Sequence, residues 1–195
     1  MARPRVREQL LDAAYDLLQR EGIAALTTRH IASCAGTTEA SVFNNFGDKA
    51  GLLYALIGER LPEVQAVKSA IDADLQDDVA AWLENVYQAA ELFYIAIIPL
   101  TSPLWGREGL GDGQLLGDRH PLHGLVVARF LQFQREGVLG AGSDACALAT
   151  IVLGAALHNG FNLVAHGHVA LAENRSGQPG RLVTSLLPLF GAVAT

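Results

Sequence analysis

The chain has 195 residues, of which 50% are hydrophobic and 17% are charged. This composition excludes an intrinsically disordered chain and indicates a globular protein with a sizeable core. Leu and Ala dominate the apolar residues and only 7% of residues are aromatic, so helices are favoured over strands.

The net charge of −6 argues against a nucleic-acid partner, but the charge is distributed unevenly. Residues 1–50 hold six basic and six acidic side chains, and the whole deficit lies in residues 51–195. Arg3, Arg5 and Arg7 form an acid-free segment that is predicted to be a basic arm. A near-neutral head with a basic arm can bind DNA despite an acidic body.

No segment predicts export or membrane insertion, so a cytoplasmic protein is expected. The longest uncharged apolar run, Ala145 to Leu157, is shorter than the roughly 20 residues that span a bilayer. Met1 to Glu8 is basic and no apolar leader follows it. Cys34 and Cys146 lie among apolar residues in helical patterns, which predicts buried free thiols without a metal.

Two helices are predicted in the first 36 residues. Apolar residues at three- and four-residue spacings predict a helix over 5–21, ended by Gly22. Thr27 is placed as the N-cap of a second helix, which stops at Gly36, a residue type that tolerates the left-handed conformation.

Two more helices follow at once. Thr38 is predicted to cap a third helix that runs through Asn45, with Ala40, Val42 and Phe43 partly inward. Asp48 is predicted to cap a fourth helix. Pro62 either kinks this helix or begins a new one.

The rest of the chain is also predicted to be helical, which gives an all-α fold. A helix from Asp77 to about Ile98 should end at Pro99. Residues 99–121 contain three prolines and five glycines and are predicted to be mostly loop. Further helices are expected over 122–136, 143–166 and 178–193.

The second and third helices form the pattern of a helix-turn-helix: a capped helix, a short turn with Gly36, and a second capped helix. In such a motif the second helix enters the major groove, and the first crosses the DNA backbone. Both helices can therefore be short. The pattern alone is weak evidence, because any helical bundle contains such turns.

The residues carry more information. The stretch "EGIAALTTRHIASCAGTTEASVFNNFGDKAGLLYAL" resembles the N-terminal DNA-binding domain of the TetR family of bacterial transcriptional regulators, over roughly residues 8–56. The resemblance implies a DNA-binding domain over 1–50, with a three-helix helix-turn-helix head, and an effector-binding and dimerisation domain over 51–195. It also implies a homodimer that binds an inverted-repeat operator and a small-molecule effector, with no catalytic site, cofactor or metal.

Carried over by position, the resemblance assigns DNA contacts to the helix starts. Thr28 and Lys49 would hold phosphates, and Arg29 would reach a base or a phosphate. On the recognition helix, Glu could accept from cytosine, Asn could pair with adenine, and an Ala methyl could contact thymine. The residues expected to bind DNA are Thr28, Arg29, Thr38, Glu39, Ala40, Ser41, Phe43, Asn44, Asn45 and Lys49.

Each assignment has a structural alternative. Glu39 favours a helix N-terminus with or without DNA, and Phe43 and Phe46 are expected to be mostly core. The family usually has Tyr where this chain has Phe43, and His or Tyr where it has Asn45. These departures predict a weaker grip on the DNA backbone, which the basic arm would offset.

Residues beyond 60 contain no recognisable catalytic set, and the histidine spacings do not match helical metal motifs. An effector pocket is expected to have apolar walls and a few polar groups. Each candidate, taken by itself, could instead be a residue that packs in the core. The candidates are Trp82, Tyr87, Phe93, Tyr94, Trp105, His123, Phe130, His158 and Asn162.

Two helices offer apolar stripes for a dimer interface. The first includes small residues, and Pro188 is predicted to kink or shorten the second. The residues are Ala147, Ile151, Gly154 and Ala155 on the first, and Leu182, Leu186, Leu189, Phe190 and Val193 on the second.

The leading prediction is a repressor released from DNA by a mostly apolar effector. The first alternative is a regulator of the same kind that responds to a protein partner or acts as an activator. A helical enzyme is the second alternative, disfavoured because no Ser/His/Asp or paired-carboxylate motif is recognisable.

Overall fold

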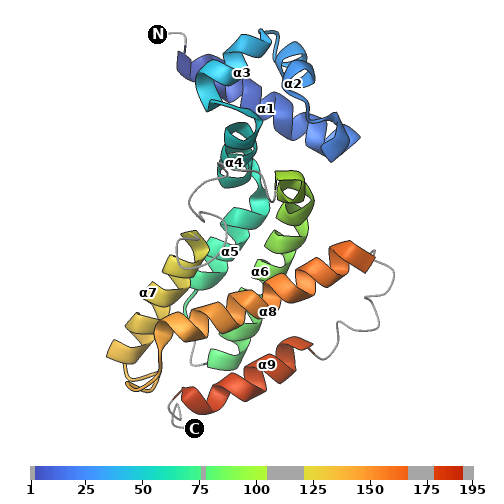
Figure 1. Ribbon diagram of the computed structural model, residues 1–195. Coiled ribbons are helices and arrows are strands. Elements are labelled where there is room, and N and C mark those ends of the chain that lie inside the picture. Colours follow the sequence, from blue (N-terminus) through green and yellow to red (C-terminus); the bar gives the residue numbers. More distant parts are fainter. Residues whose placement is uncertain (1–2, 76–77, 105–120, 167–177, 191–195) are drawn as a thin grey trace. The chain divides into compact units, whose positions relative to one another are not determined.

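The computed structural model describes residues 3–75, 78–104, 121–166 and 178–190, and these are helical apart from short connections. The chain divides into two compact units. The first comprises Met1–Val64 and Pro99–Leu110, and the second comprises Gln65–Ile98 and Gly111–Thr195. The all-α prediction is confirmed (Figure 1).

The first unit includes four helices that begin and end close to the predicted positions, and a short 3-10 turn that the sequence did not predict. Helices α1 and α4 both pack against α3, and α1 also packs against α2 and α4 (Figure 1). Each helix contributes fully buried aliphatic side chains, including Leu17, Ile31, Val42 and Leu56. The elements are α1 (Arg3–Glu21), η1 (Ile23–Ala25), α2 (Thr28–Cys34), α3 (Glu39–Phe46) and α4 (Lys49–Arg60).

The predicted basic arm is wrong in its structure, because Arg3 begins α1 and the arginines that follow lie within this helix. Arg7 donates two hydrogen bonds to Glu59 on α4, and its guanidinium carbon lies 5.3 Å from the centre of the Phe46 ring. One turn along, Arg60 on α4 bonds Glu8 and Asp12 on α1. Arg7 therefore clamps α1 to α4.

Leu61 separates α4 from α5 (Pro62–Asp72), so Pro62 begins a new helix, one of the two predicted alternatives. Proline suits a first helical turn because its missing N–H has no partner there in any case.

Helix α6 (Val79–Thr101) does not end at Pro99, as the sequence predicted. Proline removes one backbone hydrogen bond, but Leu100 and Thr101 beyond it are almost fully buried. Burial of these two side chains favours continuing the helix. A 3-10 turn, η2 (Ser102–Leu104), follows.

The second unit contains most of α5 and α6 together with α7 (Pro121–Arg135), α8 (Ala145–His166), α9 (Gln178–Leu186) and a 3-10 turn, η5 (Leu187–Leu189). Helices α7 and α8 pack together closely. The predicted helix over 178–193 is too long, because Pro188 cannot donate the bond that would continue α9. Residues 191–193 of that prediction lie outside the described residues.

Helix α8 crosses α6 at Gly160 (Figure 1), where a Cβ atom would lie 3.1 Å from the Cβ of Tyr94. Beside it, the Asn159 amide donates to the buried carboxylate of Glu91. At 22 residues and a mean hydropathy of 1.5, α8 is long and apolar enough to cross a membrane, contrary to the prediction from its first 13 residues. The Asn159–Glu91 bond and the packing on α7 show that one face of α8 lies in the core of the second unit.

Candidate nucleic-acid interface

The turn between α2 and α3 is formed by local signals that the sequence displays. The Thr27 hydroxyl caps α2 by accepting from the His30 N–H at 3.1 Å. The helix ends at Cys34; Gly36, two residues on, has a φ of 64° in the left-handed region, and the Thr37 N–H donates back to the Ala32 carbonyl at 2.9 Å. The two helices thus have the predicted starts and the predicted break.

Hydroxyl groups cluster at the start of α3. Thr38 occupies the N-cap position, but its side chain bonds no helix N–H and instead lies 3.1 Å from the Ser41 Oγ. The Thr37 hydroxyl also donates to Ser41, at 2.9 Å. The sequence did not identify Thr37 as a candidate site residue, because only the fold shows that its hydroxyl contacts α3.

Helix α3 buries a single side chain and exposes three others. Val42 is its one buried residue, whereas Ala40, Phe43 and Asn44 are exposed. The expected inward position of Ala40 and Phe43 is therefore wrong, and 48% of Phe43 is exposed. An apolar ring of this size on the surface of a short helix is available to a partner.

The two asparagines differ in their freedom. Asn45 donates its amide N–H to the Ser41 carbonyl one turn earlier, at 2.7 Å. Pairing with adenine in the two-bond manner would require Asn45 to give up this bond. The side chain of Asn44, among the described residues, makes no comparable bond.

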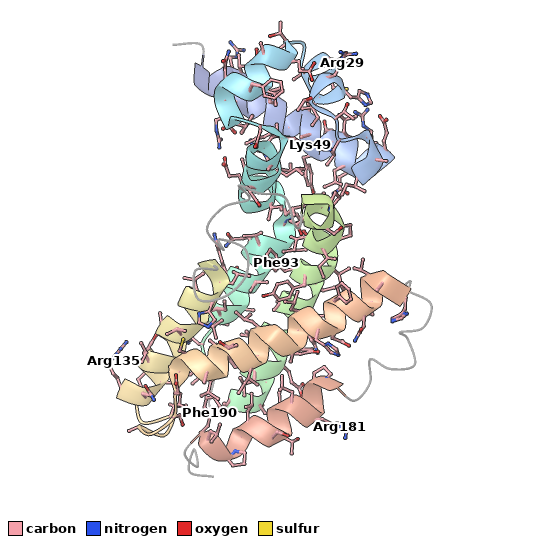
Figure 2. All side chains as sticks on the ribbon, viewed as in Figure 1. Arg29, Lys49, Phe93, Arg135, Arg181 and Phe190 are labelled. Atoms are coloured by element: carbon pink, nitrogen blue, oxygen red, sulfur yellow. The ribbon has the colours of Figure 1, made fainter. Side chains whose placement is uncertain are left out.

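Helix α4 begins beside the end of α3. The Asp48 carboxylate caps it by accepting from the Gly51 N–H at 2.7 Å. Lys49 is exposed in the first helical turn, where Figure 2 shows it in the same unit as Arg29. A cation at a helix start adds to the partial positive charge of the unpaired N–H groups, which favours a phosphate.

Glu39, the first residue of α3, contacts two predicted DNA-binding residues of α2. The Thr28 hydroxyl donates to Glu39 Oε1 at 2.5 Å, and Arg29 Nε lies 3.8 Å from Oε2. The Arg29 side chain is 90% exposed. The structure thus brings Thr28, Arg29 and Glu39 together, a grouping that the sequence did not reveal.

The first unit also contains a cavity of about 260 Å³ that Lys49 helps to line. Its other walls are apolar, and none of the residues predicted to line an effector pocket belongs to it. They are Ile23, Ala24, Leu26, Leu53, Pro99, Leu100 and Pro103. No spacing in the sequence signals this cavity, because its walls come from distant segments.

In the second unit, most of the predicted effector-lining residues are buried aromatic side chains. Trp82 packs edge-on against Phe130 at 5.9 Å and against Phe133 at 5.0 Å, and the rings of Phe93 and Tyr94 are 5.2 Å apart. The structure places Phe93 and Phe190 in this unit (Figure 2). Trp105 lies outside the described residues.

Polar groups interrupt this apolar interior. Burial raises the pKa of Tyr87 to about 12, helped by the negative charge of Glu91. Burial alone raises the pKa of Tyr94 to about 12. His123 is buried and its Nε2 lies 3.0 Å from the Thr150 hydroxyl.

The other two polar candidates, His158 and Asn162, lie on α8. His158 is exposed and its Nε2 lies 3.1 Å from the Asn162 amide nitrogen.

Both cysteines are exposed, so the prediction of buried thiols is wrong. The Cys146 sulfur lies 4.0 Å from His123 Nε2. Within the described ranges, no group of three His, Cys, Asp or Glu side chains could hold a metal ion.

A capped α2, a left-handed glycine turn and an α3 with only one buried residue define a helix-turn-helix protein. Residues 10–56 match the family model of bacterial regulatory proteins of the tetR family. This N-terminal part of the chain is therefore similar to the DNA-binding part of TetR-family regulators.

The comparisons with individual proteins extend this finding. An uncharacterised helix-turn-helix transcriptional regulator, YvkB of Bacillus subtilis (strain 168), is 36% identical over 72 residues, which cover 37% of this chain and 38% of that protein. The chain therefore matches about two-fifths of the length of this curated relative.

Two solved structures share the fold over nearly the whole chain. A TetR-family regulator from Pectobacterium atrosepticum has a TM-score of 0.59 and 18% identity, covering 96% of this chain and 93% of that one. A TetR variant from Acinetobacter baumannii AYE, in complex with minocycline, has a TM-score of 0.58 and 15% identity, with coverages of 93% and 92%.

Proposed function

We propose that the protein is a sequence-specific DNA-binding regulator of transcription that represses from an inverted-repeat operator. The observation that carries the proposal is the exposed surface of α3, which buries only Val42. Ala40, Phe43 and Asn44 are side chains that can contact thymine methyl groups, sugars and adenine in a major groove. Arg29 and Lys49 add exposed cations for phosphates.

A homodimer is part of the proposal, because helix-turn-helix proteins usually read two half-sites. One face of α8 supports it. Ile151 and Phe161 are 47% and 46% exposed, and the small residues Ala147 and Gly154 share their face at helical spacing. Small residues allow a second helix to approach closely. Leu186 and Phe190, assigned to the same interface from the sequence, are buried within the second unit.

A small, mostly apolar effector is the third part of the proposal. The structural relative from Acinetobacter baumannii AYE was solved in complex with minocycline, a small molecule. In this chain, the buried aromatic rings and His123 of the second unit are the side-chain types that line an apolar pocket with a few polar groups. Binding of the effector would favour one of two states of the dimer and so release DNA.

The test is selection of DNA from a random pool by the purified protein at two salt concentrations. An inverted repeat whose affinity falls as salt rises is the expected result. Lys49→Gln should lower affinity for that repeat and reduce its salt dependence by about one counterion per half-site. Lys68→Gln, the same charge change on α5, should leave both unchanged.

Weak binding without sequence preference by the wild-type protein, at both salt concentrations, would contradict the proposed function. Equal effects of the two lysine substitutions would contradict the assignment of Lys49 alone.

A further inference from the structure

The carboxylate of Glu39 bridges α3 to α2. Oε1 accepts from the Thr28 hydroxyl at 2.5 Å, and Oε2 lies 3.8 Å from Arg29 Nε. Glu39 is half-buried, with 39% of its side chain exposed, so the contact with Thr28 is partly shielded from water. A negatively charged hydrogen-bond acceptor, the Glu39 carboxylate, therefore already contacts Thr28 and Arg29, the two residues proposed to hold DNA phosphate.

The hydrogen-bond inventory makes this contact competitive. A threonine hydroxyl has one proton, and a phosphate oxygen can only accept. While Glu39 accepts from Thr28, that hydroxyl cannot donate to DNA. The carboxylate also offsets the charge of Arg29, although at 3.8 Å and 90% exposure that pair is weak.

Releasing Thr28 has a cost that depends on the DNA sequence. A released carboxylate beside phosphates is repelled unless it finds a donor. In the major groove the N4 amino group of cytosine is such a donor, and Glu at the start of a recognition helix can accept from it. At sites without this donor, the free energy of the lost bond and of the repulsion opposes binding.

We propose, building on the proposed DNA binding, that Glu39 determines specificity by acting as an internal competitor for phosphate. It holds the Thr28 hydroxyl and weakly offsets the charge of Arg29, and it releases both where a cytosine amino group donates to it instead. The carboxylate thus suppresses binding to DNA that lacks this donor, and adds affinity at sites that contain it.

The test compares Glu39→Gln and Glu39→Ala with Glu21→Gln, which makes the same charge change at the exposed end of α1. Dissociation constants are measured for the selected operator and for a scrambled duplex of equal length, both at one salt concentration. Thermal unfolding confirms that each variant is folded. Both Glu39 variants should bind the scrambled duplex about fivefold tighter, and Glu21→Gln should change it by less than about twofold.

A second substitution tests the hydroxyl directly. Thr28→Val should have little effect on scrambled-duplex affinity in the wild-type background, because Glu39 already occupies the proton. In the Glu39→Ala background it should remove most of the gain, since the freed hydroxyl is the group that contacts phosphate.

The proposal is overturned if the Glu39 variants gain no more than Glu21→Gln, or if they weaken binding to the scrambled duplex. Failure of the proposed function is distinguishable from these outcomes. In that case the wild-type protein selects no operator, whereas the scrambled-duplex comparison still reports on Glu39.

Discussion

Arg7 on α1 donates hydrogen bonds from both terminal nitrogens to the carboxylate of Glu59 on α4, at 2.8 Å and 2.5 Å. These bonds raise the pKa of Arg7 and lower that of Glu59. The two side chains are 52 residues apart in sequence and about one third exposed. The pair therefore links α1 to α4 within the first unit. Because Arg7 is bonded to Glu59, its guanidinium is not free to bind DNA.

A double-mutant cycle with Arg7→Gln and Glu59→Gln should give a coupling free energy of about 0.5–1 kcal/mol, reduced by solvent screening. Since the pKa of Glu59 is lowered on folding, this stabilisation is present above the ordinary glutamate pKa and is lost as the pH falls through the lowered value. Chemical denaturation at pH 7 and pH 3 measures both. A coupling that persists unchanged at pH 3 would contradict the prediction.

Gly51 should be irreplaceable in α4, because an added Cβ would lie 2.0 Å from the Phe46 carbonyl oxygen. Gly51→Ala is expected to destabilise the protein by about 1–3 kcal/mol. Gly58→Ala in the same helix meets nothing within 4 Å and should stabilise it by roughly 0.5–1 kcal/mol. Urea titration of both variants is the measurement, and equal changes would show that α4 shifts without cost.

Phe43→Tyr should strengthen DNA binding about threefold, because an added hydroxyl on this exposed ring can donate to a phosphate. Stability should not change, since the ring edge already faces solvent. Fluorescence anisotropy with the selected operator measures the effect. An unchanged dissociation constant would mean that Phe43 does not lie at the DNA backbone.

Introducing charge on the exposed face of α8 should dissociate the proposed dimer. Ile151→Asp and Phe161→Asp are each expected to weaken self-association by about 2 kcal/mol or more. Leu131→Asp on α7, where the side chain is 42% exposed, is the matched control and should leave it intact. Sedimentation velocity over a concentration series distinguishes these outcomes, and loss of the dimer in all three variants would place the interface elsewhere.

Tyr94 should make the protein less stable in alkali. Folding raises the pKa of Tyr94 to about 12, so this side chain ionises at a lower pH in the unfolded chain than in the folded one. The free energy of unfolding is therefore fully retained below pH 10 and falls as the pH rises toward 12. At pH 11 the loss amounts to about 1.4 kcal/mol. Tyr94→Phe should flatten the fall in the free energy of unfolding between pH 9 and pH 11, as measured by urea titration.

Much of the first unit follows from the sequence because its signals are local. Thr27, Gly36 and Asp48 act on residues within one helical turn, so their effects do not depend on the rest of the fold. Whether a helical side chain faces the core or the solvent was predicted less well. Phe43 and Cys34 lie at positions where helical periodicity permits either direction, and packing against neighbours decides between them.

Longer-range features were out of reach. Pro99 resembles a helix end, yet burial of Leu100 and Thr101 extends α6 past it. The bond from Thr28 to Glu39 joins residues 11 apart across a turn. Its geometry depends on the angle between α2 and α3, which no spacing in the sequence specifies.

The exposure of both cysteines makes the native chain ready for spectroscopic labelling. Cys34 ends α2 in the first unit, and Cys146 lies in the first turn of α8 in the second. A nitroxide on each thiol would place one spin in each unit without any substitution. Pulsed electron resonance on such a labelled sample would give the distribution of distances between the units, and its change when DNA or an effector is added.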